Sequence, residues 1–319
     1  MTQGRKTISL IVPFHDEAGG VSLFCDAVCA VFAQLPEYDF EVVCIDDGSS
    51  DRTLAGLMRV AERDPRFRII EFSRNFGKEA ALTAGMHEAT GDALIPIDAD
   101  LQDPPELIPD MVAAWRDGAE VVLARRADRS SDTFFKRNSA ALFYRLHNRL
   151  SAVQIPENVG DFRLMDRAVV DALKQLPERH RFMKGLFAWV GFRTVTLDYV
   201  RKPRVADKSK FPGWKLWNFA LEGITSFSVV PLRIWSGIGA IGALITFIYG
   251  LVIVTRTLLL GVDVPGYASL LVVVLFFGSV QLIGIGILGE YVGRTYMESK
   301  NRPLYIVRKR HGAKRGREP

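Results

Sequence analysis

Residues 41–51, EVVCIDDGSSD, decide the fold that this chain adopts. After Glu41, four apolar residues form a short run typical of a buried strand, and the polar residues that follow end that strand. Continuous apolar strands that alternate with amphipathic helices predict an α/β domain whose mostly parallel sheet is covered on both faces. The further strand-like runs are Thr7–Phe14 (TISLIVPF), Phe67–Phe72, 93–97 and 120–124, and helical patterns extend to residue 33 and over 78–89 and 105–116.

Polar side chains gather where these predicted strands end. In open α/β sheets, ligands bind outside the carboxyl ends of the strands. The topology therefore predicts a binding site before any single motif is considered. The residues at the ends of three strands are Asp46 and Asp47, Asp98 and Asp100, and Arg125 and Arg126.

The pair Asp98 and Asp100 has the spacing of a site for a divalent cation. Mg²⁺ is held by one or two carboxylates together with substrate phosphates, and a diphosphate leaving group needs its charge neutralised. The alternative is an ordinary helix start, because Asp103 before Pro104 fits a cap by itself. This short motif alone leaves both interpretations open.

The composition excludes several classes of protein. Of 319 residues, 48% are hydrophobic and 24% charged, which excludes a disordered chain. Three cysteines without metal-type spacing exclude a disulfide scaffold and favour small buried side chains. The net charge of +5 is concentrated in residues 294–319, where nine basic and two acidic residues give +7 and leave −2 for the rest. This distribution excludes a general nucleic-acid-binding surface.

Two uncharged apolar segments, 234–255 and 264–289, are each long enough to cross a bilayer as a helix. They predict a transmembrane hairpin with a short loop, and the basic residues on its outer flanks predict both termini in the cytoplasm. No apolar segment typical of a signal peptide occurs at the start. Glycines 237, 239 and 242, and 284, 286 and 289, spell a dinucleotide-type pattern, but within these segments they favour close helix packing, which also permits a homo-oligomer. The aromatic segment 211–227 predicts an interfacial helix, with a core helix as the alternative.

Five motifs occur in order along the chain: IVPFHDE at 11–17, IDDGSSDRT at 45–53, RNFGK at 74–78, DADLQDP at 98–104 and GDFRLM at 160–165. Together they closely resemble glycosyltransferase family 2, in particular its polyprenyl-phosphate glycosyltransferases. Within these, the likeness is greatest to the bactoprenol glucosyl transferases of O-antigen modification clusters, and it extends from about residue 7 to 307. The resemblance implies a nucleotide-sugar-binding domain of the GT-A type.

The resemblance also implies roles for individual residues, by their match to the family's motifs. The implied nucleotide-binding residues are Pro13, Glu17, Asp46, Asp47, Lys78 and Asp98, with Arg204, Ser209 and Lys210 in a mobile loop. The implied metal and diphosphate residues are Asp98, Asp100 and Gln102, those near the reacting centre are Asp161 and Asp100, and those for the acceptor phosphate are Arg126 and Arg137. The chain departs from the family pattern at His15-Asp16 and at Asp207.

The activity implied is a metal-dependent, inverting hexosyl transfer that uses Mg²⁺ or Mn²⁺. The favoured donor is UDP-glucose and the acceptor is undecaprenyl phosphate, at the cytoplasmic face of a bacterial inner membrane, for modification of O-antigen or another envelope glycan. A phosphate monoester is largely a dianion at neutral pH, so Asp161 is expected to position or stabilise rather than act as a strong base. The alternatives are a GDP-mannose or UDP-amino-arabinose donor, and a non-catalytic membrane-anchored scaffold.

The expected division of the chain follows from these segments. Residues 1–200 form the catalytic domain, and 201–231 form the mobile loop and juxtamembrane helices. Residues 232–292 hold the two transmembrane helices, and 293–319 form a basic cytoplasmic tail. A processive polysaccharide synthase is disfavoured, because the chain has too few spans and lacks a Gln-x-x-Arg-Trp motif.

Overall fold

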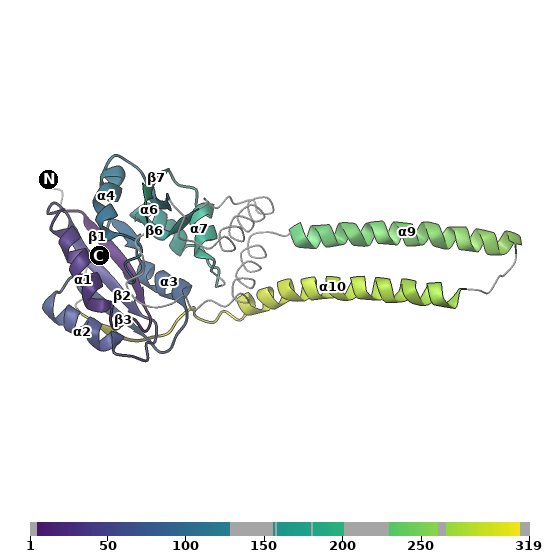
Figure 1. Ribbon diagram of the computed structural model, residues 1–319, viewed down its shortest axis with the longest axis horizontal. Helices are drawn as coiled ribbons and strands as arrows, with labels where there is room; N and C mark the ends of the chain where they lie inside the picture. Colours follow the sequence, from purple (N-terminus) through teal and green to yellow (C-terminus); the bar gives the residue numbers. More distant parts are fainter. Residues whose placement is uncertain are drawn as a thin grey trace.

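One eight-stranded sheet organises the globular part of the protein (Figure 1). The structure is a computed structural model, and it describes residues 5–127, 156, 158–179, 181–200, 230–260 and 266–312. The strand order is β7-β5-β6-β4-β1-β2-β3-β8. The strands are β1 (Thr7–Phe14), β2 (Asp39–Asp46), β3 (Phe67–Phe72), β4 (Ala93–Pro96), β5 (Val121–Arg126), β6 (Val159–Asp166), β7 (Thr194–Tyr199) and β8 (Val307–His311).

Helices cover both faces of this sheet, as the alternating sequence pattern predicts. On one face the buried apolar residues come from the strands and from α1 (Val21–Phe32), α2 (Thr53–Arg63) and α4 (Ile108–Arg116). On the other face they come from the strands and from α3 (Lys78–Glu88), α6 (Arg167–Lys174) and α7 (Met183–Trp189). A short 3-10 turn, η1 (Pro105–Leu107), precedes α4.

The four strands β1 to β4 are parallel to one another, which confirms the predicted parallel sheet. The pattern of apolar runs did not predict β6, β7 or β8. Strand β6 runs antiparallel to β4 and β5, and it contains charged residues because it contributes to the site. Strands β7 and β8 form the two edges of the sheet and are mostly exposed, so neither contains a continuous apolar run.

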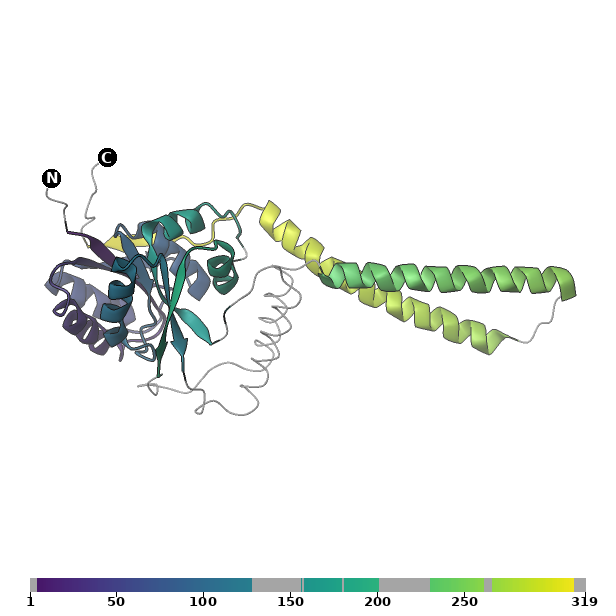
Figure 2. The ribbon, with the colours of Figure 1, turned by 90° about the horizontal axis from the view of Figure 1, so that it is seen from above.

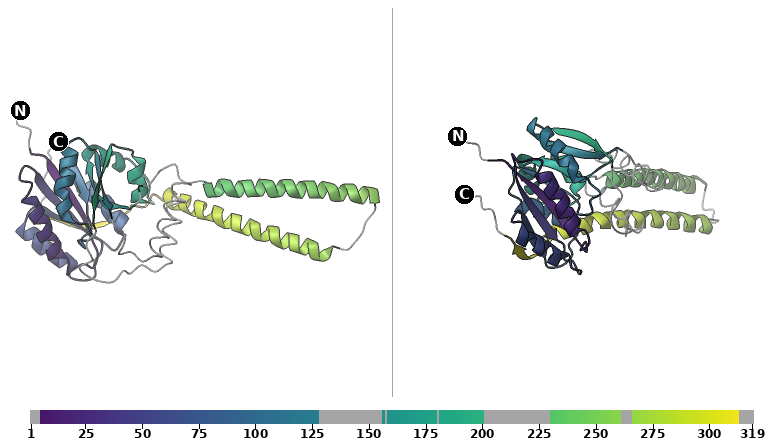
Figure 3. Two further views of the ribbon diagram at one scale, coloured as in Figure 1. Left: turned by 45° about the horizontal axis from the view of Figure 1, so that its top comes forward. Right: turned by 60° about the vertical axis from the view of Figure 1, so that its left-hand side comes forward.

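Two long helices, α9 (Val230–Leu260) and α10 (Tyr267–Ser299), extend away from the sheet side by side (Figures 1 and 3). Within them, Ile234–Ile253 and Phe276–Ser299 are long and apolar enough to cross a membrane. These two windows are 0% and 6% buried, which distinguishes them from the core helices of a soluble domain. Helix α10 continues ten residues beyond the predicted end at 289, through Glu290 and Arg294, which form an i,i+4 ion pair at 2.9 Å.

The predicted packing role of the membrane glycines holds at two positions of the described helices. A Cβ added at Gly284 of α10 would overlap the indole of Trp235 in α9, and one at Gly242 would lie 3.6 Å from Phe277. At Gly237, Gly239, Gly286 and Gly289 a Cβ would meet nothing within 4 Å. Among these six glycines, Gly284 is the one at which an added Cβ would overlap the other helix.

After α10 the chain returns to the eight-stranded sheet, whereas the sequence predicted a separate basic tail over residues 293–319. Strand β8 pairs antiparallel with β3, and three of its basic side chains bind acidic residues of the globular body. The pairs are Arg308 with Glu71 at 3.3 Å, Arg310 with Glu88 at 2.7 Å and His311 with Glu71 at 3.1 Å. These side chains serve the fold, because edge strands rich in charge can pair with acidic neighbours instead of apolar ones.

Candidate active site

The loop after β2 is joined to the loop before α3 at the carboxyl edge of the sheet. The Asp47 carboxylate accepts hydrogen bonds from the backbone N–H of Phe76 at 2.7 Å and of Gly77 at 2.9 Å. Gly48 has a positive φ of 63°, and a Cβ there would overlap the backbone of Arg74 and Asn75. The Asp-Asp-Gly motif therefore has a structural role in addition to its predicted nucleotide contacts.

Replacing Gly48 with alanine is expected to destabilise the globular body by about 1–3 kcal/mol. The left-handed backbone conformation disfavours a Cβ, and the added methyl group has no space beside residues 74 and 75. Thermal unfolding of the detergent-solubilised protein measures the effect. Gly19→Ala is the matched control, because a Cβ at Gly19 meets nothing within 4 Å. Equal unfolding midpoints for the two variants would contradict the assignment.

The loop after β1 is attached to the same region by Asp16, one of the three residues that depart from the family pattern. The Asp16 carboxylate accepts a 2.7 Å hydrogen bond from the backbone N–H of Ser50, and the Glu17 N–H donates to Thr53 Oγ1 at 2.8 Å. The hydrogen bonds from Ser50 lower the pKa of Asp16, whereas burial acts in the opposite direction. Asp16 thus fixes the predicted nucleotide-binding residue Glu17 beside the second motif.

Asp46, at the end of β2, has an unsatisfied oxygen. Its Oδ1 atom is buried and has no hydrogen-bond partner among the described residues. Burial raises the pKa of Asp46, while hydrogen bonds from Ser49 act in the opposite direction. Because a buried acceptor without a partner is costly, this atom is suited to a donor group of a ligand. Pro13, also predicted to line the nucleotide site, lies beside Ile45 in the pairing of β1 with β2.

Lys78 connects two of the predicted site carboxylates. It begins α3, directly after Gly77 with its positive φ of 95°. Its Nζ atom lies 2.6 Å from Asp98 Oδ1, after β4, and 2.7 Å from Asp161 Oδ2, in β6. The structure therefore brings together three predicted residues that lie far apart in the sequence. Burial opposes the charge of Lys78, but Asp161 and Asp98 together raise its pKa.

The surroundings of Asp161 keep its carboxylate ionised. Burial alone would raise the pKa of Asp161, but Lys78, Lys184 and Arg163 lower it to about 2. A carboxylate with such a pKa is a weak base at neutral pH, which agrees with the expected positioning or electrostatic role. Glu79 is a further residue of this cluster that the motifs did not single out. Burial and the nearby Asp161 raise the pKa of Glu79 to about 8, and its carboxylate accepts from the Met183 N–H at 3.3 Å.

Asp100 and Gln102 form the turn that follows Asp98. Asp100 Oδ1 accepts the Gln102 N–H at 3.1 Å, and Leu101 between them has a φ of 56°. The described residues contain no group of three or more acidic, histidine or cysteine side chains that would enclose a metal ion. Two carboxylates with a neighbouring amide nevertheless fit Mg²⁺ or Mn²⁺ when substrate phosphates supply further oxygens. The donor set is therefore suited to a metal that binds together with its substrate.

The two arginines that end β5 have different partners. Arg125 makes a bidentate pair with Asp198 of β7, at 2.6 and 2.9 Å. Arg126 donates to the Tyr199 hydroxyl at 3.3 Å, and that hydroxyl donates to Asp103. The N-cap residue of η1 is Pro104, one residue after Asp103, and the structure shows Asp103 as the acceptor of the Tyr199 hydroxyl. The role of Arg126 toward an acceptor phosphate stays a prediction.

Several predicted features lie outside the residues that the structure describes. They include the interfacial segment 211–227, the departure at Asp207 and the loop between the two long helices. The predicted site residues in this group are Arg137, Arg204, Ser209 and Lys210.

The class of protein follows from the fold, the site and a sequence comparison taken together. Residues 9–174 match the family described as Glycosyl transferase family 2. The chain belongs to this family, and it is a glycosyltransferase with a nucleotide-sugar-binding domain of the GT-A type. The resemblance given by the five motifs is thereby confirmed.

Several relatives match over nearly the whole chain. The chain is 55% identical over 304 residues to the SfII prophage-derived bactoprenol glucosyl transferase of Shigella flexneri, covering 95% of this chain and 98% of the relative. It is 53% identical over 302 residues to the prophage bactoprenol glucosyl transferase homolog of Escherichia coli K12, again covering 95% and 98%. An uncharacterized glycosyltransferase of Synechocystis is 49% identical over 300 residues, which is 94% of each chain. The similarity therefore includes the two long helices as well as the catalytic domain.

Proposed function

We propose that the protein transfers glucose from UDP-glucose to undecaprenyl phosphate with inversion at the anomeric carbon. The observation that carries the proposal is the cluster of Lys78, Asp98 and Asp161 at the carboxyl edge of the sheet. It joins the motif expected to hold the diphosphate to the carboxylate expected near the reacting centre. Two of the three relatives described above are named as a bactoprenol glucosyl transferase or as a homolog of one, which supports the glucose and the polyprenyl carrier.

In the proposed reaction, an oxygen of the acceptor phosphate forms a bond to the anomeric carbon of glucose, and the bond from that carbon to UDP breaks. Asp98, Asp100 and Gln102 would hold Mg²⁺ or Mn²⁺, which would neutralise the charge of the diphosphate. Asp46, with its unsatisfied oxygen, and Asp47 hold the nucleoside. The acceptor phosphate is already a dianion, so no strong base is required.

Asp161 and Lys78 have complementary parts in this proposal. The ionised Asp161 stabilises positive charge that develops on the sugar ring as the leaving group departs. Lys78 holds Asp161 in place and keeps a positive charge beside the diphosphate motif. The prediction that Asp161 positions rather than deprotonates therefore agrees with its lowered pKa.

The proposed location is the cytoplasmic face of the bacterial inner membrane, with α9 and α10 crossing it as a hairpin. The sheet supports the hairpin topology, because β7 precedes the two long helices and β8 follows them in the same sheet. Both ends of the hairpin must therefore lie on one side of the membrane. The Lys/Arg-rich flanks assign that side to the cytoplasm.

The full-length protein in detergent or lipid discs is expected to release UDP and form a glycolipid from UDP-glucose and undecaprenyl phosphate. The reaction should require Mg²⁺ or Mn²⁺ and should stop when a chelator is added, because the diphosphate needs its charge neutralised in order to leave. UDP release and radiolabelled lipid measure it. GDP-mannose and UDP-amino-arabinose, in the same assay, test the donor.

Two results would reject parts of this proposal. Faster transfer from another nucleotide sugar than from UDP-glucose would replace the donor and keep the reaction class. Saturable UDP-glucose binding without release of UDP, over the whole panel and with both metals, would favour the non-catalytic scaffold.

A further inference from the structure

The C-terminal end of α10 is bound directly to the globular body. Between α6 and α7, the backbone N–H of Arg179 donates to both carboxylate oxygens of Glu298, in the last turn of α10, at 3.0 and 3.1 Å. The Arg179 guanidinium donates to the Asn301 side-chain oxygen at 3.0 Å and to the Arg302 carbonyl oxygen. Asn301 has a φ of 51°, a left-handed conformation that commonly ends a helix. These contacts of Arg179 form a clasp, the Arg179 clasp, where the chain leaves α10.

The chain that follows the Arg179 clasp is held to the body at a second place. The Tyr305 ring stacks on Phe72 of β3 with their centroids 5.1 Å apart, and its hydroxyl lies 3.2 Å from His87 Nδ1. The Ser73 N–H donates to the Ile306 carbonyl oxygen at 3.0 Å. The connection from α10 to β8 is therefore bound at both of its ends. Helix α10 thus has a defined orientation relative to the sheet.

The segment that carries the Arg179 clasp continues directly into the reacting-centre cluster. Four residues after Arg179, the backbone N–H of Met183 donates to the Glu79 carboxylate at 3.3 Å, where α7 begins. Glu79 and Lys184, the next residue of α7, both interact electrostatically with Asp161. A short piece of chain thus joins the end of α10 to the neighbours of Asp161.

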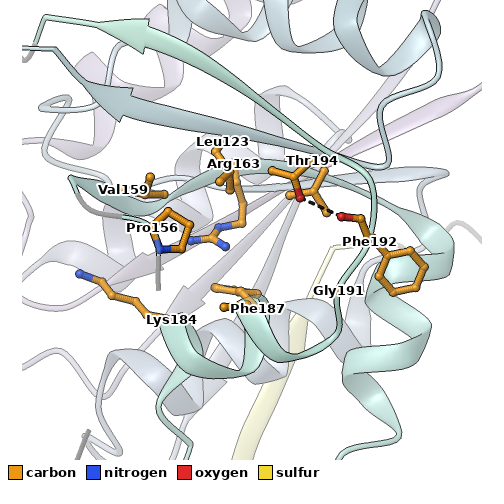
Figure 4. Close-up of a pocket in the computed structure, with 11 residues that line it drawn as sticks. Leu123, Pro156, Val159, Arg163, Lys184, Phe187, Gly191, Phe192 and Thr194 are labelled. Carbon is orange, nitrogen blue, oxygen red and sulfur yellow. Dashed lines mark hydrogen bonds between the residues drawn. The ribbon is translucent and has the colours of Figure 1, made fainter. Parts of the chain in front are cut away.

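Helix α7 also packs against the strand that contains Asp161. Figure 4 shows Lys184 and Phe187 of α7 on one side of a cavity and Val159 and Arg163 of β6 on the other. The Arg163 guanidinium lies over the Phe187 ring at 4.0 Å. In Figures 1 and 2, α7 is on the side of the sheet nearest to α9 and α10. A displacement of α10 would therefore act first on the helix that adjoins the site.

We propose that the Arg179 clasp is a positioning contact, which holds the catalytic domain at a fixed height and angle on α10 during transfer to a lipid in the membrane. This inference rests on the proposed function, and it gives Arg179 and Glu298 a role that requires no contact with a substrate. The phosphate of a membrane-bound acceptor moves in the plane of the lipid headgroups. A catalytic domain that tilts away from that plane meets the acceptor in the productive geometry less often. An acceptor dissolved in water can approach the site in any orientation of the domain.

The test compares two acceptors with the full-length protein in lipid discs: undecaprenyl phosphate in the bilayer and geranyl phosphate in solution. Glu298→Ala removes the carboxylate of the clasp, and Arg179→Ala removes its guanidinium contacts. Each is expected to lower kcat/KM for undecaprenyl phosphate about tenfold and to change kcat/KM for geranyl phosphate less than about twofold. The double variant should be no worse than the more affected single one, because both act through one contact.

Matched controls come from the helices that cover the other face of the sheet. Glu62→Ala in α2 and Arg116→Ala in α4 remove exposed side chains of the same kinds and should leave both acceptors unaffected. The clasp variants should still fold, because β8 and Tyr305 keep their own partners. A destabilised catalytic domain would lower transfer to both acceptors equally. That result, or full transfer to undecaprenyl phosphate in both single variants, would overturn the proposal.

A distance measurement tests the clasp without any turnover. Spin labels are attached at Asp117→Cys, after α4, and at Val292→Cys, in α10, both exposed positions, with Cys29 replaced by serine. The distance between the labels should have a narrow distribution, and the Arg179→Ala/Glu298→Ala double variant should broaden it. An equally narrow distribution in the double variant would overturn the clasp as a positioning contact. Broadening in a protein that transfers no sugar would support the clasp, and such inactivity would reject only the proposed function.

Discussion

Replacing Asp161 with asparagine is expected to lower the rate of glucosyl transfer by about 10²- to 10⁴-fold. The substitution keeps the size of the side chain and removes its charge, so Lys78 loses one of its two carboxylate partners. The sugar ring also loses the negative charge proposed to stabilise it as UDP departs. Binding of UDP-glucose should change little, because the nucleotide contacts are expected from other loops. Initial rates and donor binding by calorimetry measure the two effects separately.

The pH profile of the wild type gives a second view of the same residue. The pKa of Asp161 is lowered to about 2, so the carboxylate stays ionised throughout pH 5–8 and should contribute no acid limb there. The control for Asp161→Asn is Asp117→Asn, which makes the same substitution at an exposed position after α4. It should keep full activity. An Asp161→Asn enzyme with more than about a tenth of the wild-type rate would contradict the assigned role.

Replacing Asp100 with asparagine is expected to lower turnover by about 10³-fold or more, the second large effect. An asparagine side-chain oxygen can still accept the hydrogen bond from the Gln102 N–H, so the turn should persist. What is lost is a negative charge expected to hold Mg²⁺ or Mn²⁺, which is worth several kcal/mol in phosphate chemistry. The concentration of metal that gives half-maximal rate should therefore rise together with the fall in turnover.

The control for this prediction is Asp110→Asn, which removes an exposed carboxylate in the first turn of α4. Its rate and metal dependence should match those of the wild type. Full turnover with unchanged metal dependence in Asp100→Asn would remove Asp100 from the metal site and leave Asp98 as its sole carboxylate.

The sequence predicted the central part of the sheet well, because β1, β2, β3, β4 and β5 are apolar runs with polar ends. It also predicted which side chains lie at the carboxyl edge of that sheet. Apolar periodicity could not predict β6, because the charged residues Asp161 and Arg163 interrupt its apolar pattern. The same holds for β8, which is charged because its partners are acidic.

The contacts within the site could not be predicted from the motifs. Lys78 meets Asp161 only because β6 enters the sheet antiparallel beside β4, which brings it next to the start of α3. Glu79 acquires its raised pKa from burial and from Asp161, neither of which is visible in the sequence. Asp16 departs from the family pattern. Its carboxylate accepts a hydrogen bond from the Ser50 N–H, which joins the loop after β1 to the loop after β2.

The return of the chain to β8 has a practical consequence for any attempt to obtain the catalytic domain without its membrane helices. A chain shortened to end after β7 would lose β8, although β8 lies at the opposite border of the sheet. Strand β3, all of whose residues are buried, would then expose an edge of unpaired backbone groups, which favours self-association. A soluble catalytic domain is better sought by joining β7 to residues 301–312 through a flexible linker, so that the last strand is retained.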